Sequence, residues 1–515
     1  MQRIAIRVGL LLLVQTCCAG ALDAESFRIS AKPSRNRRLA PELDLVRECK
    51  GNLVGFCRRG KPIIEVPSDQ APKMQSMALS SEAEAPQAKR RPVRLLISYD
   101  QQAGRPTDTS LKAAGLRALE DYRHGAFLVV EPVATVSAQT VETLLNDETV
   151  VHAAPDYIMS IPSKEEVATI QETENSATPT DPLYGKLWGM KNINANKVWQ
   201  IHREAPSVIV AVIDTGVDYN HPDLKDNMWT RNGRHGFDFF DDDDQPLDEQ
   251  NHGSHVAGTI AAVGNNNVGV VGVCWKAQIM AMRFLGPDGS GVTSDAVKCI
   301  DWAVANGAHV LCNSWAGPDS SVELQAAIAR AEQKGVLFVA AAGNTVGNGN
   351  NNDTSPYYPA ALPNPNIIAV GAIDVNDARG SFSHYGRKTV DIGAPGVGIV
   401  STVLNNQYAQ FDGTSMAAPH VAGAAALVWA KTFATPTQSP AQMTTVRDLI
   451  CQNARPIPAL ANFWGHAAPA RVPGGVLDLS FLLGSSPGQT PSTPVTPVVR
   501  RFIERRAVVD PTKLR

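Results

Sequence analysis

Three polar side chains in this sequence, an aspartate, a histidine and a serine, stand in contexts that suit nucleophilic catalysis. Asp214 ends an apolar run, while His252 and Ser415 each open a stretch rich in small and apolar residues. A serine hydroxyl is a weak nucleophile near neutral pH, so it needs a base within hydrogen-bond reach, and that base needs an orienting acceptor. Histidine and a buried aspartate supply these two functions. We therefore predict that Asp214 orients His252 and that His252 activates Ser415.

A nucleophilic attack on a carbonyl group also needs a donor for the developing oxyanion. Asn344 follows the apolar run Leu337–Ala341 and is placed to supply it. Simpler interpretations exist, because Asp and Asn are common turn residues and serine is a common helix cap. His255 follows His252 by one helical step, but no third ligand stands nearby to complete a zinc site, so we interpret it as a structural neighbour.

Short apolar runs alternate with helical stretches between Asp181 and Leu483. The runs show little polar alternation, which indicates strands buried on both faces of a parallel sheet. We predict an α/β fold, an open and mostly parallel twisted sheet with helices on both faces, whose strand ends gather functional groups at one edge. The expected strands are Val208–Ile213, Gln278–Phe284, Val310-Leu311, Leu337–Ala341 and Ile367–Val370, and the clearest helices are Ser294–Asn306, Ser321–Lys334 and Ser415–Lys431, with Pro419 in the first turn of the last.

The ends of the chain differ in composition from this region. Residues 1–21 have a basic start, a short apolar run and a small-residue cleavage site, which predicts a signal peptide. Residues 22–92 are polar and are expected to be loosely ordered. Residues 163–180 read as an exposed linker of the kind that proteases cut. Residues 484–515 are a flexible Ser/Pro/Thr-rich segment with a basic end.

Residues 93–162 are predicted to form a small α+β unit. The apolar runs Val93–Ile97, Phe127–Val130 and Val150-Val151 favour strands, and Leu111–Tyr122 and Val136–Leu145 favour helices. The resulting β-α-β-α-β order describes a compact unit that precedes the larger domain.

Charge and cysteine content narrow the class of protein. The formal net charge of −3 gives no reason to expect a nucleic-acid or anionic-membrane partner, and no later apolar run is long enough to span a bilayer. Cys49 and Cys57 are spaced for a local disulfide in an oxidising compartment. The four later cysteines permit three pairings or buried free thiols, and the sequence does not choose between them; they are Cys274, Cys299, Cys312 and Cys451.

Four blocks of sequence together resemble a known family. They are Val-Ile-Asp-Thr-Gly-Val-Asp around Asp214, His-Gly-Ser-His-Val-Ala-Gly-Thr from His252, Ala-Ala-Gly-Asn ending at Asn344, and Gly-Thr-Ser-Met-Ala-Ala-Pro-His-Val-Ala-Gly around Ser415. In this order, across residues 181–483, they resemble the subtilisin-like serine proteases. The resemblance implies a secreted serine endopeptidase, a monomer that cleaves proteins and peptides and contacts neither nucleic acid nor membrane.

The resemblance also implies a zymogen and a substrate cleft. Residues 93–162 would be an inhibitory prosegment that the enzyme removes itself, which places the mature start between Pro162 and Asp181. An extended peptide would add as a strand between two backbone edges; these are Gly289, Ser290 and Gly291 on one side, and Ser314, Trp315, Ala316 and Gly317 on the other. The family usually has glycine where Ala316 stands, so the extra methyl group is expected to narrow the pocket for the residue before the cleaved bond. Neither edge contains an acidic residue, which favours a large uncharged residue there.

Calcium is the cofactor that the resemblance implies. Asp181, Asp223 and the loop that contains Asn266, Val268 and Val270 match family ligands, and their oxygens suit this hard cation. A second site is conceivable at the acidic run Asp241–Asp244 with Asp248, where a solvated acidic turn is an equal alternative.

Two other classes of protein were weighed against the endopeptidase. An α/β-hydrolase esterase requires G-x-S-x-G and the order Ser, Asp, His, which this chain does not have. A binding protein on an inactive protease scaffold remains the alternative, although the constellation here is complete. Asn352 begins an N-x-[ST] sequence, so it is a predicted glycosylation site in a eukaryotic secretory route.

Overall fold

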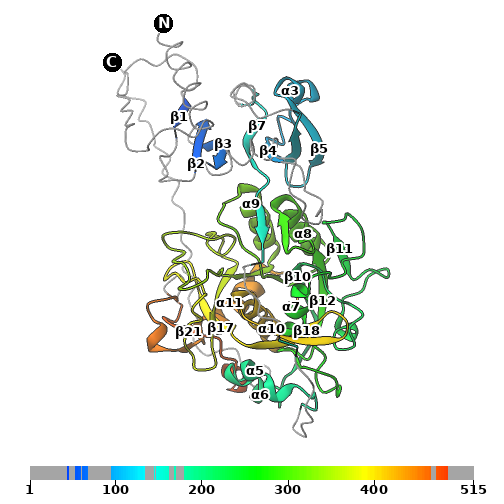
Figure 1. Ribbon diagram of the computed structural model, residues 1–515, viewed down its shortest axis with the longest axis vertical. Helices are drawn as coiled ribbons and strands as arrows, with labels where there is room; N and C mark the ends of the chain where they lie inside the picture. The colour runs from blue at the N-terminus through cyan, green and yellow to red at the C-terminus, as the bar shows by residue number, and fades with distance from the viewer. Residues whose placement is uncertain are drawn as a thin grey trace, which may run out of the picture.

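The structure, a computed structural model, describes residues 94–133, 144, 147–161, 179–465 and 471–484, together with the backbone of four short strands. These strands are β1 (Leu43–Leu45), β2 (Leu53–Arg58), β3 (Lys61–Pro67) and β9 (Ala168–Thr169). The predicted signal peptide, Cys49 and the tail after Gly484 lie outside the described residues. Figure 1 shows a small unit at the top and a larger domain below it.

The larger domain is built on a nine-stranded sheet in which all neighbouring strands are parallel except the short pair at one edge. Its strands in spatial order are β11 (Gly236–Asp238), β12 (Lys276–Arg283), β10 (Glu204–Asp214), β14 (Val310–Asn313), β15 (Leu337–Ala341), β16 (Ile367–Ile373), β17 (Ile392–Pro395), β21 (Gly475–Val476) and β20 (Arg455–Pro456). The predicted α/β class is confirmed, and each predicted strand is present with its ends shifted by at most a few residues.

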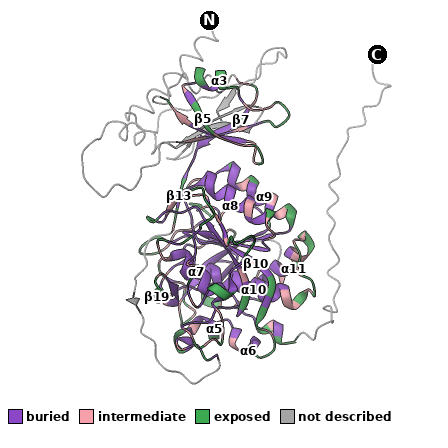
Figure 2. Ribbon diagram, turned by 90° about the vertical axis from the view of Figure 1, so that its right-hand side faces the viewer, coloured by how far each residue is buried: buried purple, intermediate pink, exposed green. Residues whose placement is uncertain are grey.

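Helices cover both faces of this sheet. Along β10, Val210 and Val212 enter one apolar cluster while Ala211 and Ile213 enter the other, as the two-residue period of a strand requires. The first cluster contains α7 (His252–Ala261), α10 (Thr414–Thr432) and α11 (Pro440–Gln452), and the second contains α8 (Thr293–Ala305) and α9 (Val322–Lys334). Figure 2 shows α7 and α10 as buried helices beside the central strands.

The remaining elements are short and surround the sheet. They are η1 (Tyr184–Lys186), α5 (Trp188–Asn192), α6 (Ala195–Val198), η2 (Lys225–Asn227), β13 (Ser290–Val292), β18 (Ile399–Val403), β19 (Gln407–Phe411), η3 (Pro458–Leu460) and η4 (Ser480–Gly484). No helix among the described residues is both long and apolar enough to cross a membrane.

The small unit departs from its predicted element order. It contains β4 (Leu95–Tyr99), α3 (Asp108–Ala113), β5 (Leu116–Tyr122), β6 (Phe127–Pro132), β7 (Val150–Pro155) and β8 (Ile158–Ser160). The helix predicted over Leu111–Tyr122 is wrong, because Gly115 adopts a positive φ of 71° and ends the helix before a strand begins. The predicted helix Val136–Leu145 lies largely outside the described residues.

The leader, residues 22–92, also contains more structure than predicted. Strands β1, β2 and β3 extend the sheet of the small unit, and β3 pairs in parallel with β7. The prediction of a loosely ordered leader is therefore wrong for these strands. The average polarity of the segment concealed two short β-favouring runs, Leu53–Arg58 and Lys61–Pro67, which lie two residues apart in the sequence.

The sequence left open whether the four cysteines of the larger domain form disulfides or are free. In the structure all four are buried free thiols. Cys274 and Cys451 belong to one apolar cluster and Cys299 to the other, where the thiols pack as small apolar groups.

Candidate active site

Asp214 and His252 form a fully buried pair at the carboxyl end of β10. His252 Nδ1 lies 2.7 Å from Asp214 Oδ1, and both side chains have no exposed surface. The same Asp214 oxygen accepts a hydrogen bond of 2.7 Å from the backbone N–H of Thr215. Because Asp214 is the last residue of β10 and His252 is the first of α7, the two elements meet at the sheet edge and fix the orientation of the imidazole.

Asp248, which was predicted as part of a second calcium site, instead holds the start of α7 in place. One carboxylate oxygen of Asp248 accepts hydrogen bonds from Ser254 N (2.9 Å) and Ser254 Oγ (2.7 Å), and the other accepts one from Thr215 Oγ1 (2.8 Å). Thr215 Oγ1 in turn accepts from Gly253 N at 2.9 Å. Asp248 therefore joins the loop after Asp214 to the helix of His252, and its oxygens are already engaged by hydrogen-bond donors.

Ser415 is the second residue of α10, and it forms a reciprocal pair with Ser314, which follows β14. Ser415 Oγ donates to the carbonyl oxygen of Ser314 (3.0 Å), and Ser314 Oγ donates to the carbonyl oxygen of Ser415 (2.9 Å). The second bond has a local cause. Pro419 is the sixth residue of α10, so the prediction that it lies in the first turn is wrong. At this position a residue would normally donate its backbone N–H to the carbonyl oxygen of Ser415, but proline has no N–H. The Ser314 hydroxyl supplies the missing donor.

Asn344 follows β15 and contacts the residues just before Ser415. Its Oδ1 accepts hydrogen bonds from Thr414 N (3.0 Å) and Thr414 Oγ1 (2.9 Å). Because these bonds identify Oδ1 as the acceptor, the amide nitrogen Nδ2 points away from Thr414. Asn344 Nδ2 lies 3.2 Å from the position that a Cβ atom on Gly413 would occupy.

The four predicted residues thus gather along one edge of the sheet. Asp214 ends β10, and Ser314 and Asn344 follow β14 and β15; these three strands are adjacent and parallel, about 4.8 Å apart. Helices α7 and α10 pack against one another and begin at this same edge. The arrangement supplies a buried carboxylate, an imidazole, a hydroxyl and an amide donor, which are the groups that acyl transfer requires.

His255 is a structural neighbour, as predicted. Its Nε2 lies 3.0 Å from the carbonyl oxygen of Ile399 and 3.2 Å from that of Ala409, and its ring stacks on Phe411. Burial lowers the pKa of His255 to about 3, so the side chain is neutral. It ties α7 to β18 and β19.

Both predicted substrate edges are occupied by one segment of this chain. Strand β8 pairs antiparallel with β13, so that Ser160 faces Ser290 and Met159 faces Gly291. On the same side, the N–H of Ile161 donates to the carbonyl oxygen of Gly289 at 3.0 Å. On the other side, Ser160 exchanges two backbone hydrogen bonds with Ala316, at 3.2 and 2.9 Å.

Two glycines lie directly against side chains of this segment, and one of them, Gly289, adopts a positive φ of 73°. A Cβ atom on Gly317 would lie 2.8 Å from Met159 Sδ, and one on Gly289 would lie 2.7 Å from the end of Ile161. The edges are therefore shaped for a strand with large side chains.

The first predicted calcium ligands come together in the structure. Asn266 Nδ2 donates to Asp223 Oδ1 (2.8 Å), Val270 N donates to Asp223 Oδ2 (2.9 Å), and Val268 N donates to Asn266 Oδ1 (2.9 Å). Asp181 accepts from Asn265 N at 2.8 Å and is buried like Asp223. Burial raises the pKa of Asp181 to about 6 and that of Asp223 to about 7, the latter also because the two carboxylates repel each other. Among the described residues neither carboxylate forms an ion pair, and two such buried carboxylates fit a bound cation.

The acidic residues of the second predicted site do not converge. Asp241 pairs with Arg283 (3.2 Å) and Asp244 with Arg234 (2.9 Å), while Asp248 points to α7. Arg283, which is buried, also binds Asp238 and Glu249, so this loop already contains its own cation. The prediction of a second calcium site is not supported.

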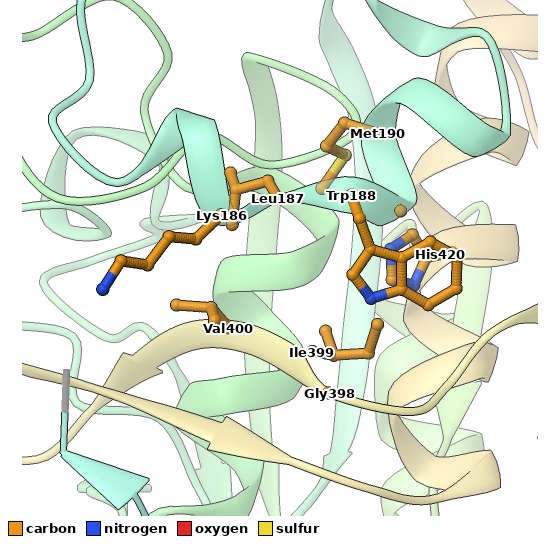
Figure 3. Close-up of a pocket in the computed structure, with 9 residues that line it drawn as sticks. Lys186, Leu187, Trp188, Met190, Gly398, Ile399, Val400 and His420 are labelled. Atoms are coloured by element: carbon orange, nitrogen blue, oxygen red, sulfur yellow. The ribbon is translucent and has the colours of Figure 1, made fainter. Parts of the chain in front are cut away.

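Two other features lie away from this edge. A pocket of about 10 Å³, room for about one water molecule, lies between Trp188, Met190, Val400 and His420, and none of its lining residues belongs to the triad or the substrate edges (Figure 3). The predicted glycosylation site is wrong for the folded protein, because Asn352 is buried and its Nδ2 donates to the carbonyl oxygen of Ala342 at 2.8 Å.

The fold and this edge define an α/β serine protease. Residues 206–477, more than half of the chain, match the Subtilase family, and the protein belongs to it. The Thermophilic serine proteinase of Bacillus sp. (strain AK1) is 40% identical over 322 residues, which cover 62% of this chain and 73% of that protein. Thermitase of Thermoactinomyces vulgaris is 42% identical over 252 residues (49% and 85%), and Subtilisin BL of Lederbergia lenta is 44% identical over 241 residues (47% and 83%). The family match and these relatives confirm the predicted serine endopeptidase.

Proposed function

We propose that the protein is a secreted serine endopeptidase, made as a zymogen, in which Asp214, His252 and Ser415 are the catalytic triad. Ser415 Oγ attacks the carbonyl carbon of the substrate while His252 accepts its proton and Asp214 stabilises the imidazolium that forms. The leaving amine takes that proton, and water then hydrolyses the acyl-enzyme by the same route. The observation that carries the proposal is the buried Asp214–His252 contact of 2.7 Å at the strand edge shared with Ser415.

Asn344 is proposed as the donor to the oxyanion of the tetrahedral intermediate. Its Oδ1 is held by Thr414, the residue before the nucleophile, so its nitrogen is oriented before substrate arrives. A donor fixed in advance is most effective at the charge that develops in the transition state.

Residues 93–162 are proposed as the inhibitory prosegment, which blocks the cleft through β8. Several polar contacts with the larger domain support this. Asp156 accepts hydrogen bonds from Ser294 N (2.8 Å) and Ser294 Oγ (2.7 Å) at the start of α8. Tyr122 donates to Asp301 at 3.1 Å, Lys298 pairs with Glu120, and His152 lies 3.2 Å from Glu323 on α9.

The pairing register supports a processing site shortly after β8. Ser160 faces Ala316 in an antiparallel bridge, and an antiparallel register continued by two residues would bring Pro162 opposite Ser314, whose carbonyl oxygen accepts from Ser415 Oγ. Strand β9 pairs with β19, which ends four residues before Ser415, so the chain is held again beyond the cut. We therefore expect self-cleavage between Pro162 and Ala168, within the predicted window.

Substrates are proposed to bind as β8 does, as extended segments of proteins and peptides between the two edges. We also propose a structural calcium ion whose ligands are Asp181, Asp223, Asn266, Val268 and Val270. Its charge would neutralise the two buried carboxylates. Export is proposed to depend on the signal peptide, and the mature enzyme is expected to act as a monomer.

Comparison of the full-length chain with its Ser415→Ala variant tests this function. The wild-type protein should release a mature form whose N-terminus follows Pro162 by a few residues, and the variant should remain an intact precursor. N-terminal sequencing and casein turnover are the measurements. Equal processing of both proteins would show that another protease makes the cut, and wild-type protein that fails to cleave casein after processing would instead favour the binding-protein alternative.

A further inference from the structure

The loop that carries Asn344 rests on a buried histidine, His384, from the segment after β16. Backbone hydrogen bonds join the two: His384 N donates to the Gly343 carbonyl (2.9 Å), and Thr345 N donates to the Phe382 carbonyl (2.9 Å). Asn344 and Ser383 form an antiparallel bridge between these bonds. The backbone around Asn344 is therefore held by the segment after β16, while Thr414 holds the Asn344 side chain.

Both nitrogens of the His384 ring bind residues of the same loop. Nδ1 lies 3.1 Å from Asn352 Oδ1, and Nε2 lies 2.6 Å from Thr345 Oγ1. Asn352 uses its Nδ2 to bind the Ala342 carbonyl, so its Oδ1 must accept. Nδ1 of His384 therefore carries the proton, and Nε2 accepts the hydrogen bond of the Thr345 hydroxyl.

The ring also fills the space beside Gly343. A Cβ atom on Gly343 would lie 2.7 Å from His384 Nδ1, and Gly343 adopts a φ of 106°, which only glycine adopts readily. Tyr357 covers the ring edge-on, with centroids 4.6 Å apart. Burial lowers the pKa of His384 to about 4, so the ring keeps one donor and one acceptor at neutral pH.

We propose that His384 is a positioning residue that holds the Gly343–Asn344 peptide, and with it the Asn344 amide, in the place required for the oxyanion. The inference rests on the proposed function of Asn344. The side chain acts by joining Thr345, the residue after Asn344, to Asn352, which binds the carbonyl of Ala342 before it, and by packing on Gly343. It touches neither the substrate nor the triad.

A double-mutant cycle between His384 and Asn344 tests this inference. Active sites are counted with a serine-directed phosphonylating reagent, so that kcat refers to folded enzyme only. His384→Ala should lower kcat about 10-fold or more with little change in KM, because an oxyanion contact is made mainly in the transition state. In the Asn344→Ala background the same change should lower kcat less than twofold. His384→Asn, which keeps a donor near Asn352, should recover part of the loss.

A matched control is His309→Ala, another buried histidine, which lies at the start of β14 and far from the strand's carboxyl end. It should lower the melting temperature without lowering kcat. Equal losses of kcat from His384→Ala in both backgrounds, or a change in KM alone, would overturn the inference while leaving the function of Asn344 intact. If Asn344→Ala itself leaves kcat unchanged, the oxyanion assignment fails, and the inference fails with it.

Discussion

At the scale of single residues, the position where this chain departs from the usual family pattern is Ala316. Both its N–H and its carbonyl bind Ser160, so the backbone contact with an extended peptide does not depend on the side chain. The methyl group can therefore change selectivity without changing how substrate is held.

We predict that Ala316→Gly widens the pocket for the residue before the cleaved bond. Removing one methyl group from such a pocket changes discrimination by about 10-fold or more. The ratio of kcat/KM for a peptide with Phe at this position to one with Ala should rise by that order. A peptide series that varies only this residue measures it, with Ala361→Gly as a control outside both edges. An unchanged ratio would place the Ala316 methyl group outside the pocket.

The residues that we propose to perform chemistry were easier to predict from the sequence than those that support them. Asp214, His252, Asn344 and Ser415 each stand at the boundary of a recognisable strand or helix, so local pattern placed them. Asp248 could not be placed in this way, because its partners Thr215 and Ser254 lie on separate elements and an acidic run next to it suggested a metal loop. Only three-dimensional contacts distinguish these two uses of a carboxylate.

At the scale of elements, the start of α10 depends on a compensation between two residues. Pro419 deprives the Ser415 carbonyl of its helical donor, and Ser314 Oγ replaces that donor. A buried carbonyl left without a partner costs about 1–3 kcal/mol.

We predict that Ser314→Ala lowers the free energy of unfolding by that amount and that Pro419→Ala reduces the loss. The alanine at 419 restores the helical N–H, so the hydroxyl of Ser314 is no longer needed. Urea unfolding of the two single variants and the double variant, all in an inactive Ser415→Ala background to prevent autolysis, measures both effects. Losses of the same size with and without Pro419 would show that the Ser314 hydroxyl does not replace the helical donor.

At the scale of elements, the sequence prediction failed where the spacing of apolar residues is compatible with both a helix and a strand. Leu111, Leu116 and Leu119 are spaced as on a helix, yet the backbone turns at Gly115, and Leu119 is exposed while Leu111 and Leu116 are buried. The parallel strands of the larger domain were predictable because their apolar runs are continuous. Strand β8 was not, because its position comes from β13 and Ala316 and not from its own residues.

At the scale of the whole molecule, the proposed calcium site joins Asp181, near the start of the larger domain, to the loop after α7. Binding at 100 times the dissociation constant adds about 2.7 kcal/mol of stability. We therefore predict that chelation lowers the melting temperature of the Ser415→Ala protein by about 5–10 °C. Scanning calorimetry with and without calcium measures this. Asp223→Asn should abolish the difference and Asp244→Asn should preserve it. A difference that survives Asp223→Asn would locate calcium elsewhere.

The contact between the small unit and the larger domain should depend on pH through Asp156. Burial at the start of α8 raises the pKa of this carboxyl to about 6, whereas an exposed aspartate titrates near 4. Between these values the docked unit binds a proton that the released unit lacks. Docking is therefore stronger at pH 4 and weakens as the pH rises to about 6, above which this contribution is constant.

The Ser415→Ala precursor tests that dependence directly when a trace of active enzyme has cut its linker, because the two pieces then stay together only through non-covalent contacts. The fraction that co-elutes in gel filtration should fall between pH 4 and pH 6 and stay constant at higher pH. Asp156→Asn keeps an acceptor and a donor for Ser294 but cannot ionise, so its pieces should co-elute to the same extent across this range. His124→Ala, which removes an exposed partner of Asp301 at the same interface, should leave the pH dependence unchanged. If the Asn variant retained the full pH dependence, another group at the interface would have to carry the titration.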